Sequence, residues 1–285
     1  TARSDGVLEP LELYEQMRAW GSTLVAITDH DTLAGVREML AAGCGAPGTT
    51  GPRLIVGVEI NTMVDAEVEA VGGTEERLSE LHILGLGMDP DDAALSETLE
   101  RQRGARERRL RRTLERLREL GMPVDEHLPQ VEGGIDALGR PHVARALVSA
   151  GHAEDVQDAF ARYLVPGMPA YVRRQGIGPR AAIEAIITAG GIASLAHASW
   201  AADEPEVIDE LMRWGLGALE VHYHHWDEER IERMGAFADD RGLLHTGGSD
   251  YHGDTETYAE SQSAVFVPPI AGERLLTALG SVIEL

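Results

Sequence analysis

Three short segments place acidic or imidazole side chains next to residues that are typical of turns. They are Ser4-Asp5-Gly6, Thr28-Asp29-His30-Asp31 and Gly248-Ser249-Asp250-Tyr251-His252, and single donors add to them at Glu59, His82 and His197. Nitrogen and oxygen donors without sulfur suit Mn²⁺, Fe²⁺ or Zn²⁺ in a catalytic site rather than a Cys-type structural zinc site. Two such ions about 3.5–4 Å apart can clamp the attacking and leaving oxygens of a phosphoryl displacement.

Each of these residues is weak evidence by itself. A single His is more often a packed or surface residue than a ligand, and an Asp after Ser or Gly usually caps a turn. Glu59 could equally be a strand-end charge with an arginine partner. The interpretation therefore depends on the ordered set and on the elements that would bring it together.

Short apolar runs alternate with helical patterns, and most of the runs end at one of these donors. The runs cover 24–27, 54–58, 81–86, 192–196, 218–221 and 243–244. Continuous apolar runs are typical of parallel strands buried on both faces, and in parallel α/β barrels the active site lies at the carboxyl ends of the strands. The pattern therefore predicts one rim that holds His30, Glu59, His197, Asp250 and His252. His82 lies near the start of its run and fits this rim less well.

Helical periodicity predicts helices over 8–20, 33–42, 97–120 and 141–150. Residues 93–169 contain no strong strand run, so we interpret them as a helical subdomain inserted into a barrel made of 1–92 and 170–285. The segment 97–120 carries nine arginines and five glutamates. A solvated face with ion pairs three and four residues apart is the favoured interpretation, and an arginine wall that faces phosphate is the alternative.

Composition limits the classes of protein that fit. The chain has 285 residues, 43% of them hydrophobic, one cysteine, no lysine and a formal net charge of −23. Its length and apolar content suffice for a large core, and it has neither a run of 18 apolar residues nor a signal segment, so we expect no membrane span. The acidic charge argues against binding of duplex nucleic acid, although a local basic pocket could hold a small phosphorylated ligand. The lone Cys44 makes the cytoplasm the simplest compartment.

The ordered motifs resemble those of the PHP (polymerase and histidinol phosphatase) superfamily. The resemblance rests on Ser4-Asp5-Gly6, Thr28-Asp29-His30-Asp31, Gly57-Val58-Glu59-Ile60, Leu81-His82-Ile83-Leu84-Gly85, Ala196-His197 and Gly248-Ser249-Asp250-Tyr251-His252. It implies a distorted seven-stranded β/α barrel, or (β/α)7 barrel, with two or three divalent metal ions. Position by position, it implies one ion at Asp5, His30 and His252, a second at Glu59, His82 and His197, and a third site that includes Asp250 and Glu59.

The segments 141–148 and 163–172 are similar to the branch that hydrolyses 3′,5′-nucleotide bisphosphates, some members of which trim the 5′ ends of short RNA. The resemblance implies that metal-activated hydroxide attacks phosphorus while an arginine offsets phosphoryl charge, and Arg140 is our candidate. His197 and Asp250 are the predicted catalytic residues. Predicted substrate contacts are Arg140, His142 and the loop residues His224 and His225. The expected partner is a nucleotide or a short single-stranded RNA end.

The chain departs from the family pattern in three places. The family opens with a His-x-His pair before its Ser-Asp-Gly, and here Thr1 stands about where the following residue would be. Since the chain lacks an initiating Met, we interpret this as truncation, and we expect the third metal site to be weak or empty. Trp226 occupies a position where relatives carry a phosphate-contacting histidine, and Met168 occupies one where some carry lysine.

Three alternatives stay open at the level of sequence. The chain could be a histidinol-phosphate phosphatase of the same superfamily, which the insertion argues against. It could be a non-catalytic PHP module that binds a nucleotide or supports a partner, which the nearly full ligand set argues against. It could also be a metal-dependent amidohydrolase, although that family often uses a metal-bridging lysine and this chain has none.

Overall fold

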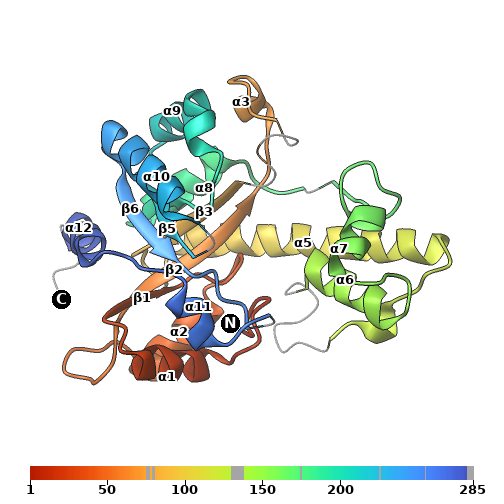
Figure 1. Ribbon diagram of the computed structural model, residues 1–285, viewed down its shortest axis with the longest axis horizontal. Helices are drawn as coiled ribbons and strands as arrows, with labels where there is room; N and C mark the ends of the chain where they lie inside the picture. Colours follow the sequence, from red (N-terminus) through yellow and green to blue (C-terminus); the bar gives the residue numbers. More distant parts are fainter. Residues whose placement is uncertain are drawn as a thin grey trace.

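One curled sheet carries the candidate donors along a single rim. The computed structural model describes residues 1–74, 78, 81–129, 138–173, 175–224, 226–253 and 255–280. Within these residues six strands pair in the order β1-β2-β3-β4-β5-β6 (Figure 1). They are β1 (Leu24–Ile27), β2 (Arg53–Thr62), β3 (Leu81–Leu86), β4 (Ile192–Leu195), β5 (Ala218–Tyr223) and β6 (Leu244–Gly248). The strands are rich in Val, Ile and Leu, which suit a pleated surface covered on both faces.

The sheet is mixed, so the expectation of an all-parallel sheet is wrong at β3. β1 pairs with β2, β4 with β5 and β5 with β6 in parallel, whereas β3 runs antiparallel to both of its neighbours. The reversal explains why His82 lies near the start of its strand. The first residues of β3 lie at the same rim as the carboxyl ends of β1 and β2, and His82 pairs in register with Asn61 of β2.

Helices cover the outside of the curled sheet, where α8 packs on β3, α10 on β5 and α12 on β6 (Figure 1). The predicted helices form with shifts of a few residues at their ends, because capping residues rather than apolar periodicity set helix ends. The helices are α1 (Pro10–Trp20), α2 (Ala34–Ala41), α3 (Ala66–Glu69), α5 (Ala93–Glu119), α6 (Arg140–Ser149), α7 (Val156–Ala159), α8 (Pro179–Thr188), α9 (Pro205–Arg213), α10 (Glu228–Arg241), α11 (Tyr258–Ser263) and α12 (Pro269–Gly280), with 3₁₀ turns at Asp125–His127 and Ala201–Asp203 and a π turn at Phe160–Leu164.

The long helix α5 joins two hydrophobic clusters. It begins at the N-cap Asp92, whose side chain accepts a hydrogen bond from Leu95 N, and it runs from the sheet to the group that contains α6 and α7 (Figure 1). Its first turns place Leu95 and Leu99 in the core of the sheet. Its later turns contribute to a second cluster with side chains of α6 and of the segment that follows it, through Leu110, Leu114 and Leu117.

No helix in the described part of the chain is long and apolar enough to cross a membrane.

Candidate metal centre

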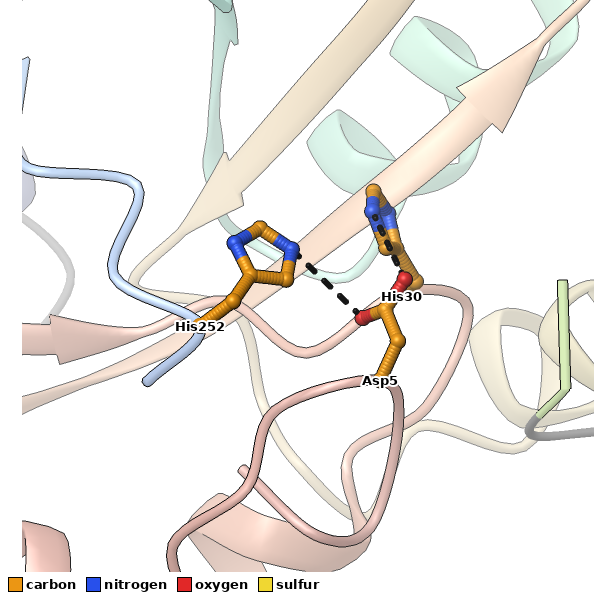
Figure 2. A group of neighbouring side chains, drawn as sticks. All are labelled: Asp5, His30 and His252. Atoms are coloured by element: carbon orange, nitrogen blue, oxygen red, sulfur yellow. Dashed lines mark ion pairs between the residues drawn. The ribbon is translucent and has the colours of Figure 1, made fainter. Parts of the chain in front are cut away.

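Asp5, His30 and His252 converge on one point of the rim from three different segments. Asp5 lies in the turn before α1, His30 follows β1, and His252 follows β6 (Figure 2). The two oxygens of Asp5 face different histidines: Oδ2 is 3.7 Å from His30 Nε2, and Oδ1 is 3.7 Å from His252 Nε2. One donor atom from each of the three residues lies within 4.8 Å of the others, a spacing that a single ion can bridge.

Glu59 is the centre of a second group. Its Oε1 lies 2.6 Å from His82 Nδ1 and 3.4 Å from His197 Nε2, while its Oε2 lies 3.7 Å from His30 Nδ1. The two histidines also approach each other, with 3.1 Å between His197 Nε2 and His82 Nδ1. Glu59 is buried, and His30 belongs to both groups, so the two groups are contiguous.

Asp250 lies beside these groups and is more exposed. Its Oδ1 is 3.7 Å from His252 Nδ1, and its Oδ2 accepts a hydrogen bond of 3.0 Å from the Tyr223 hydroxyl. Asp250, His197 and Asp31 are the non-glycine residues of the described chain with positive φ, at 49°, 32° and 56°. Left-handed backbone in such residues costs free energy and clusters at functional sites. All three lie at the rim, either as candidate donors or next to one.

Charges at the site hold its carboxylates in the ionised form. Burial opposes ionisation of Glu59, but His30 and His82 keep its pKa well below the usual value. Burial likewise opposes ionisation of Asp5, but His30, Arg106 and His252 keep its pKa below the usual value. In the other direction, burial lowers the pKa of His252, but Asp5 and Asp250 more than offset that effect and raise it. The site therefore presents ionised oxygen donors to a cation.

The donor chemistry fits divalent metal ions. Both groups combine carboxylate oxygens with imidazole nitrogens and contain no cysteine among the described residues. This is the ligand set of catalytic zinc, manganese or iron sites. The seven predicted metal ligands, Asp5, His30, Glu59, His82, His197, Asp250 and His252, thus lie side by side on one rim, while their division among individual ions stays a prediction.

Residues that the sequence did not single out surround these donors. Asn61 Nδ2 lies 2.8 Å from His30 Nδ1 and donates to Asp31 Oδ2 at 3.1 Å. Arg106 of α5 places Nη2 3.2 Å from Asp5 Oδ2, and its side chain is 11% exposed. The sequence contained an indication that both residues lie near the donors. Asn61 is two residues after Glu59 and so shares its face of β2, and Arg106 is part of the arginine-rich helix.

A cavity opens beside the donors and has a basic wall. It has a volume of about 160 Å³, and its lining includes the donors Asp5, His30 and His82 together with the arginines Arg106, Arg109 and Arg140. The α5 residues thus face a cavity next to the candidate metal centre. For Arg106 and Arg109 the favoured interpretation of a solvated arginine face is wrong, because both line this cavity.

The predicted substrate contacts differ in their placement. Arg140, the first residue of α6, lines the basic cavity. His142 is buried, and its Nδ1 accepts a hydrogen bond from Gly139 N at 3.1 Å, so it helps to form the start of α6. His224 is buried after β5, with Nε2 3.4 Å from Glu256 Oε1. His225 lies outside the described residues.

Known proteins resemble the chain over nearly its whole length. It is 31% identical over 258 residues to a 5′-3′ exoribonuclease of Haemophilus influenzae, covering 87% of this chain and 86% of the relative. It is 29% identical over 281 residues to a 3′,5′-nucleoside bisphosphate phosphatase of Chromobacterium violaceum, covering 94% of this chain and 90% of the relative. None of the known protein-family models matches the chain.

Solved structures agree with these relatives. A protein from Bifidobacterium adolescentis, described as a metal-dependent phosphoesterase, superposes with a TM-score of 0.74 at 31% identity, covering 98% of this chain and 93% of that one. A Chromobacterium violaceum protein described as an amidohydrolase, with sulfate bound, superposes with a TM-score of 0.75 at 27% identity, covering 93% and 95%.

The arrangement of carboxylates and imidazoles, the extent of these similarities and the hydrolase names of the relatives agree with one another. The chain is a hydrolase, and it belongs to the PHP family of metal-dependent phosphoesterases, together with the exoribonucleases and bisphosphate phosphatases that it resembles.

Proposed function

We propose that the chain releases phosphate from 3′,5′-nucleotide bisphosphates or from the 5′ ends of short RNA. The observation that carries this proposal is the basic cavity beside the metal-type donors. In a chain with a net charge of −23, Arg106, Arg109 and Arg140 line a cavity that is also lined by Asp5, His30 and His82. Such a cavity suits a ligand that carries phosphate beyond the one that reacts. Relatives with the names reported above support the same class of substrate.

In this proposal, one set of residues would bind the metal ions and another would bind the substrate. Asp5, His30 and His252 would hold one divalent ion, Glu59, His82 and His197 a second, and Asp250 would contribute to a third. Mn²⁺, Fe²⁺ and Zn²⁺ all fit these donors. Bound there, the ions would supply Lewis-acid activation of water and of the phosphoryl group.

The protein part of the mechanism is positioning and charge. Arg140 would bind phosphoryl oxygens from the α6 side of the cavity, and His142 would hold the first turn of α6 in place through its contact with Gly139 N. Asp250 lies at the open side of the rim, and Tyr223 donates a hydrogen bond to it. Asp250 and His197, which lie beside the other donors, are the proposed catalytic residues. Buried His224 and the neighbouring His225 complete the proposed substrate contacts.

The finer architecture is part of the same proposal. We propose that 93–169 form an inserted helical subdomain on a barrel made of 1–92 and 170–285, which the second hydrophobic cluster supports. A (β/α)7 barrel would need a seventh strand, and the outer edges of β1 and β6 are where it would pair. A cytoplasmic location is supported by the single cysteine, which has no disulfide. Neither duplex nucleic acid nor a membrane is a proposed partner.

The test compares four substrates, using the same enzyme preparation and the same concentration of added Mn²⁺ for each. Phosphate release is measured from adenosine 3′,5′-bisphosphate, adenosine 3′-monophosphate, a 5′-phosphorylated trinucleotide RNA and histidinol phosphate. We expect the bisphosphate or the trinucleotide to give the highest kcat/KM. A preference for histidinol phosphate would replace the proposed substrate, and bound metal without release from any of the four would favour a nucleotide-binding role.

Asp250→Asn provides the matching test of the site. We expect this variant to lose at least about 100-fold in kcat, because an amide neither takes up a proton nor binds a cation as a carboxylate does. Asp240→Asn is the control, because it makes the same substitution of amide for carboxylate at an exposed position of α10. Equal metal content and equal phosphate release in both variants would remove Asp250 from the site.

A further inference from the structure

Glu220 is a buried acid in the first half of β5, where its neighbours are apolar. It lies in β5 between Leu219 and Val221, and it is 5% exposed. Burial raises the pKa of this carboxyl to about 8, and the nearby Asp250 and Glu59 add to the rise, although the backbone N–H and the charge of His197 oppose it. A carboxyl group in such a place is unfavourable unless it makes a specific hydrogen bond. The contact that Glu220 makes is therefore informative.

That contact is with the backbone of a candidate metal ligand. Glu220 Oε2 accepts a hydrogen bond of 2.7 Å from the His197 N–H. β4 ends at Leu195, so this N–H lies beyond the strand. His197 also has φ of +32°, a backbone conformation that residues other than glycine rarely adopt and that needs support from its surroundings. The Glu220 carboxyl supplies a partner for the amide in that conformation.

The conformation of His197 decides where its imidazole lies. Its Nε2 is 3.1 Å from His82 Nδ1 and 3.4 Å from Glu59 Oε1, at the centre of the second donor group. Glu220 itself makes its hydrogen bond to the His197 backbone N–H and not to these side-chain atoms. It reaches the metal centre through the backbone of His197 rather than as a ligand.

The neighbouring strand packs against the same carboxyl. A Cβ atom added to Gly248 of β6 would stand 3.1 Å from Glu220 Oε1, so this glycine leaves the room that the acid occupies. Oε2 of Glu220 thus lies just beyond the end of β4, and Oε1 lies next to Gly248 at the end of β6. Gly248 is two residues before Asp250.

We propose that Glu220 is a positioning residue, which holds the His197 backbone so that its imidazole faces Glu59 and His82. The proposal rests on the proposed site, in which His197 is a metal ligand. Its chemistry is that of an outer partner that orients a metal-binding histidine, here through the main chain instead of the second ring nitrogen.

Two substitutions separate the hydrogen bond from the volume of the side chain. Glu220→Gln keeps a carbonyl oxygen that can accept the His197 N–H, whereas Glu220→Leu fills a similar space without an acceptor. Thr246→Val is the matched control, because Thr246 is buried opposite Glu220 on the adjacent strand, and its hydroxyl pairs with Ser194 Oγ at 2.9 Å. Thermal unfolding of each variant verifies that it folds.

The first readout is amide hydrogen exchange in the metal-free protein. We expect the His197 amide to exchange faster in Glu220→Leu than in the unsubstituted chain, Glu220→Gln or Thr246→Val. The second readout is Mn²⁺ affinity by titration. We expect it to fall about 10- to 100-fold in Glu220→Leu, the range typical of lost outer partners. It should fall less in Glu220→Gln and stay unchanged in Thr246→Val.

Unchanged exchange or unchanged Mn²⁺ affinity in Glu220→Leu would overturn the proposal, and so would equal losses in the Leu and Gln variants. If Glu220→Leu fails to fold, Glu220→Gln provides the test. Its His197 amide must stay protected from hydrogen exchange, and loss of that protection would overturn the proposal. Failure of the proposed function would look different. The His197 exchange pattern would follow the expectation while the unsubstituted chain released no phosphate from any substrate.

Discussion

Glu59 connects the candidate donors at the scale of single residues. One buried carboxylate contacts three histidines that come from three segments of the chain, after β1, in β3 and after β4. Because a buried charge needs compensation, Glu59 favours groups and ions of positive charge around it. The position of this single side chain explains why the imidazoles converge there rather than pack separately.

Arg140 is the residue that tests the substrate part of the proposal. We expect Arg140→Ala to raise KM for adenosine 3′,5′-bisphosphate about 10- to 100-fold with little change in kcat. A hydrogen bond to a charged group contributes about 1.5–3 kcal/mol, and it would be lost from ground state and transition state alike. Steady-state kinetics on adenosine 3′-monophosphate supplies the control, since this substrate lacks the second phosphate. Equal losses on both substrates would contradict a role in binding that phosphate.

Glu220 gives the metal-free protein a specific dependence on pH. Its pKa is about 8 in the folded protein and 4.5 without the fold, so the folded state keeps a proton that the unfolded state has lost between these values. The contribution of Glu220 to stability is therefore present below about pH 4.5 and is lost as the pH rises towards 8. We expect Glu220→Gln to weaken the fall in the free energy of unfolding between pH 5 and pH 8, measured by urea denaturation without metal. An identical pH profile for both proteins would refute this assignment.

That the seven candidate donors lie near one another could be predicted from the sequence, because each stands in one of the ordered motifs, while their role as metal ligands stays a prediction. Their supporting residues could not be predicted, for physical reasons. Glu220 was visible as a charge inside an apolar run, but nothing in the sequence says which backbone N–H it meets. Tyr223 contacts Asp250 across two strands whose pairing includes a register shift between Glu220 and His222. Such contacts depend on register, which the local pattern does not determine.

At the scale of elements, β3 shows where the sequence pattern is silent. Its residues 81–86 were predicted as a strand and form one, but apolar content does not encode strand direction. The misfit of His82 at the start of the run was the signal for a reversed strand. In the same way, α5 was predicted over 97–120 and begins earlier, at Ala93, because the Asp92 side chain caps it.

Gln102 of α5 ties the helix to the sheet. Its Nε2 donates to Asn61 O at 2.5 Å and its Oε1 accepts from Ile177 N at 2.9 Å, and it is 4% exposed. We expect Gln102→Leu to lower the free energy of unfolding by about 2–5 kcal/mol. The buried Asn61 carbonyl and the partly buried Ile177 N–H would lose their partners, at about 1–3 kcal/mol each, with the N–H at the lower end of this range. Urea denaturation measures this loss.

Arg111→Ala is the control on the same helix. The Arg111 side chain is 59% exposed and pairs with Glu107 at 2.6 Å, and exposed pairs of this kind contribute less than about 1 kcal/mol. A loss in Gln102→Leu as small as that in Arg111→Ala would show that α5 does not depend on these two hydrogen bonds.

At the scale of the whole molecule, a strongly acidic chain has a basic cavity next to its donors. We expect a mononucleotide to stay within the reach of that cavity, whereas a longer RNA would extend over the surface of a chain whose net charge is −23. We expect kcat/KM for a 5′-phosphorylated RNA of about ten nucleotides to rise between 0.01 and 0.15 M salt. Over this range the screening length falls from about 30 Å to about 8 Å.

Steady-state rates on that RNA and on adenosine 3′,5′-bisphosphate, at equal Mn²⁺, measure the difference. The bisphosphate should respond less, because it does not extend beyond the cavity. A steep fall of the RNA rate with salt would instead reveal a basic track for the strand, as in proteins that release counterions from nucleic acid.

The continuous helix α5, with 27 residues, has an evolutionary consequence. The metal-type donors come from the rim of the sheet, while the arginines of the basic cavity come from α5 and α6. In the proposed assignment, the donors and this basic wall are thus encoded in separate stretches of the gene. We expect mutations in α5 and α6 to change which esters the protein accepts, while selection on the rim keeps the reaction unchanged.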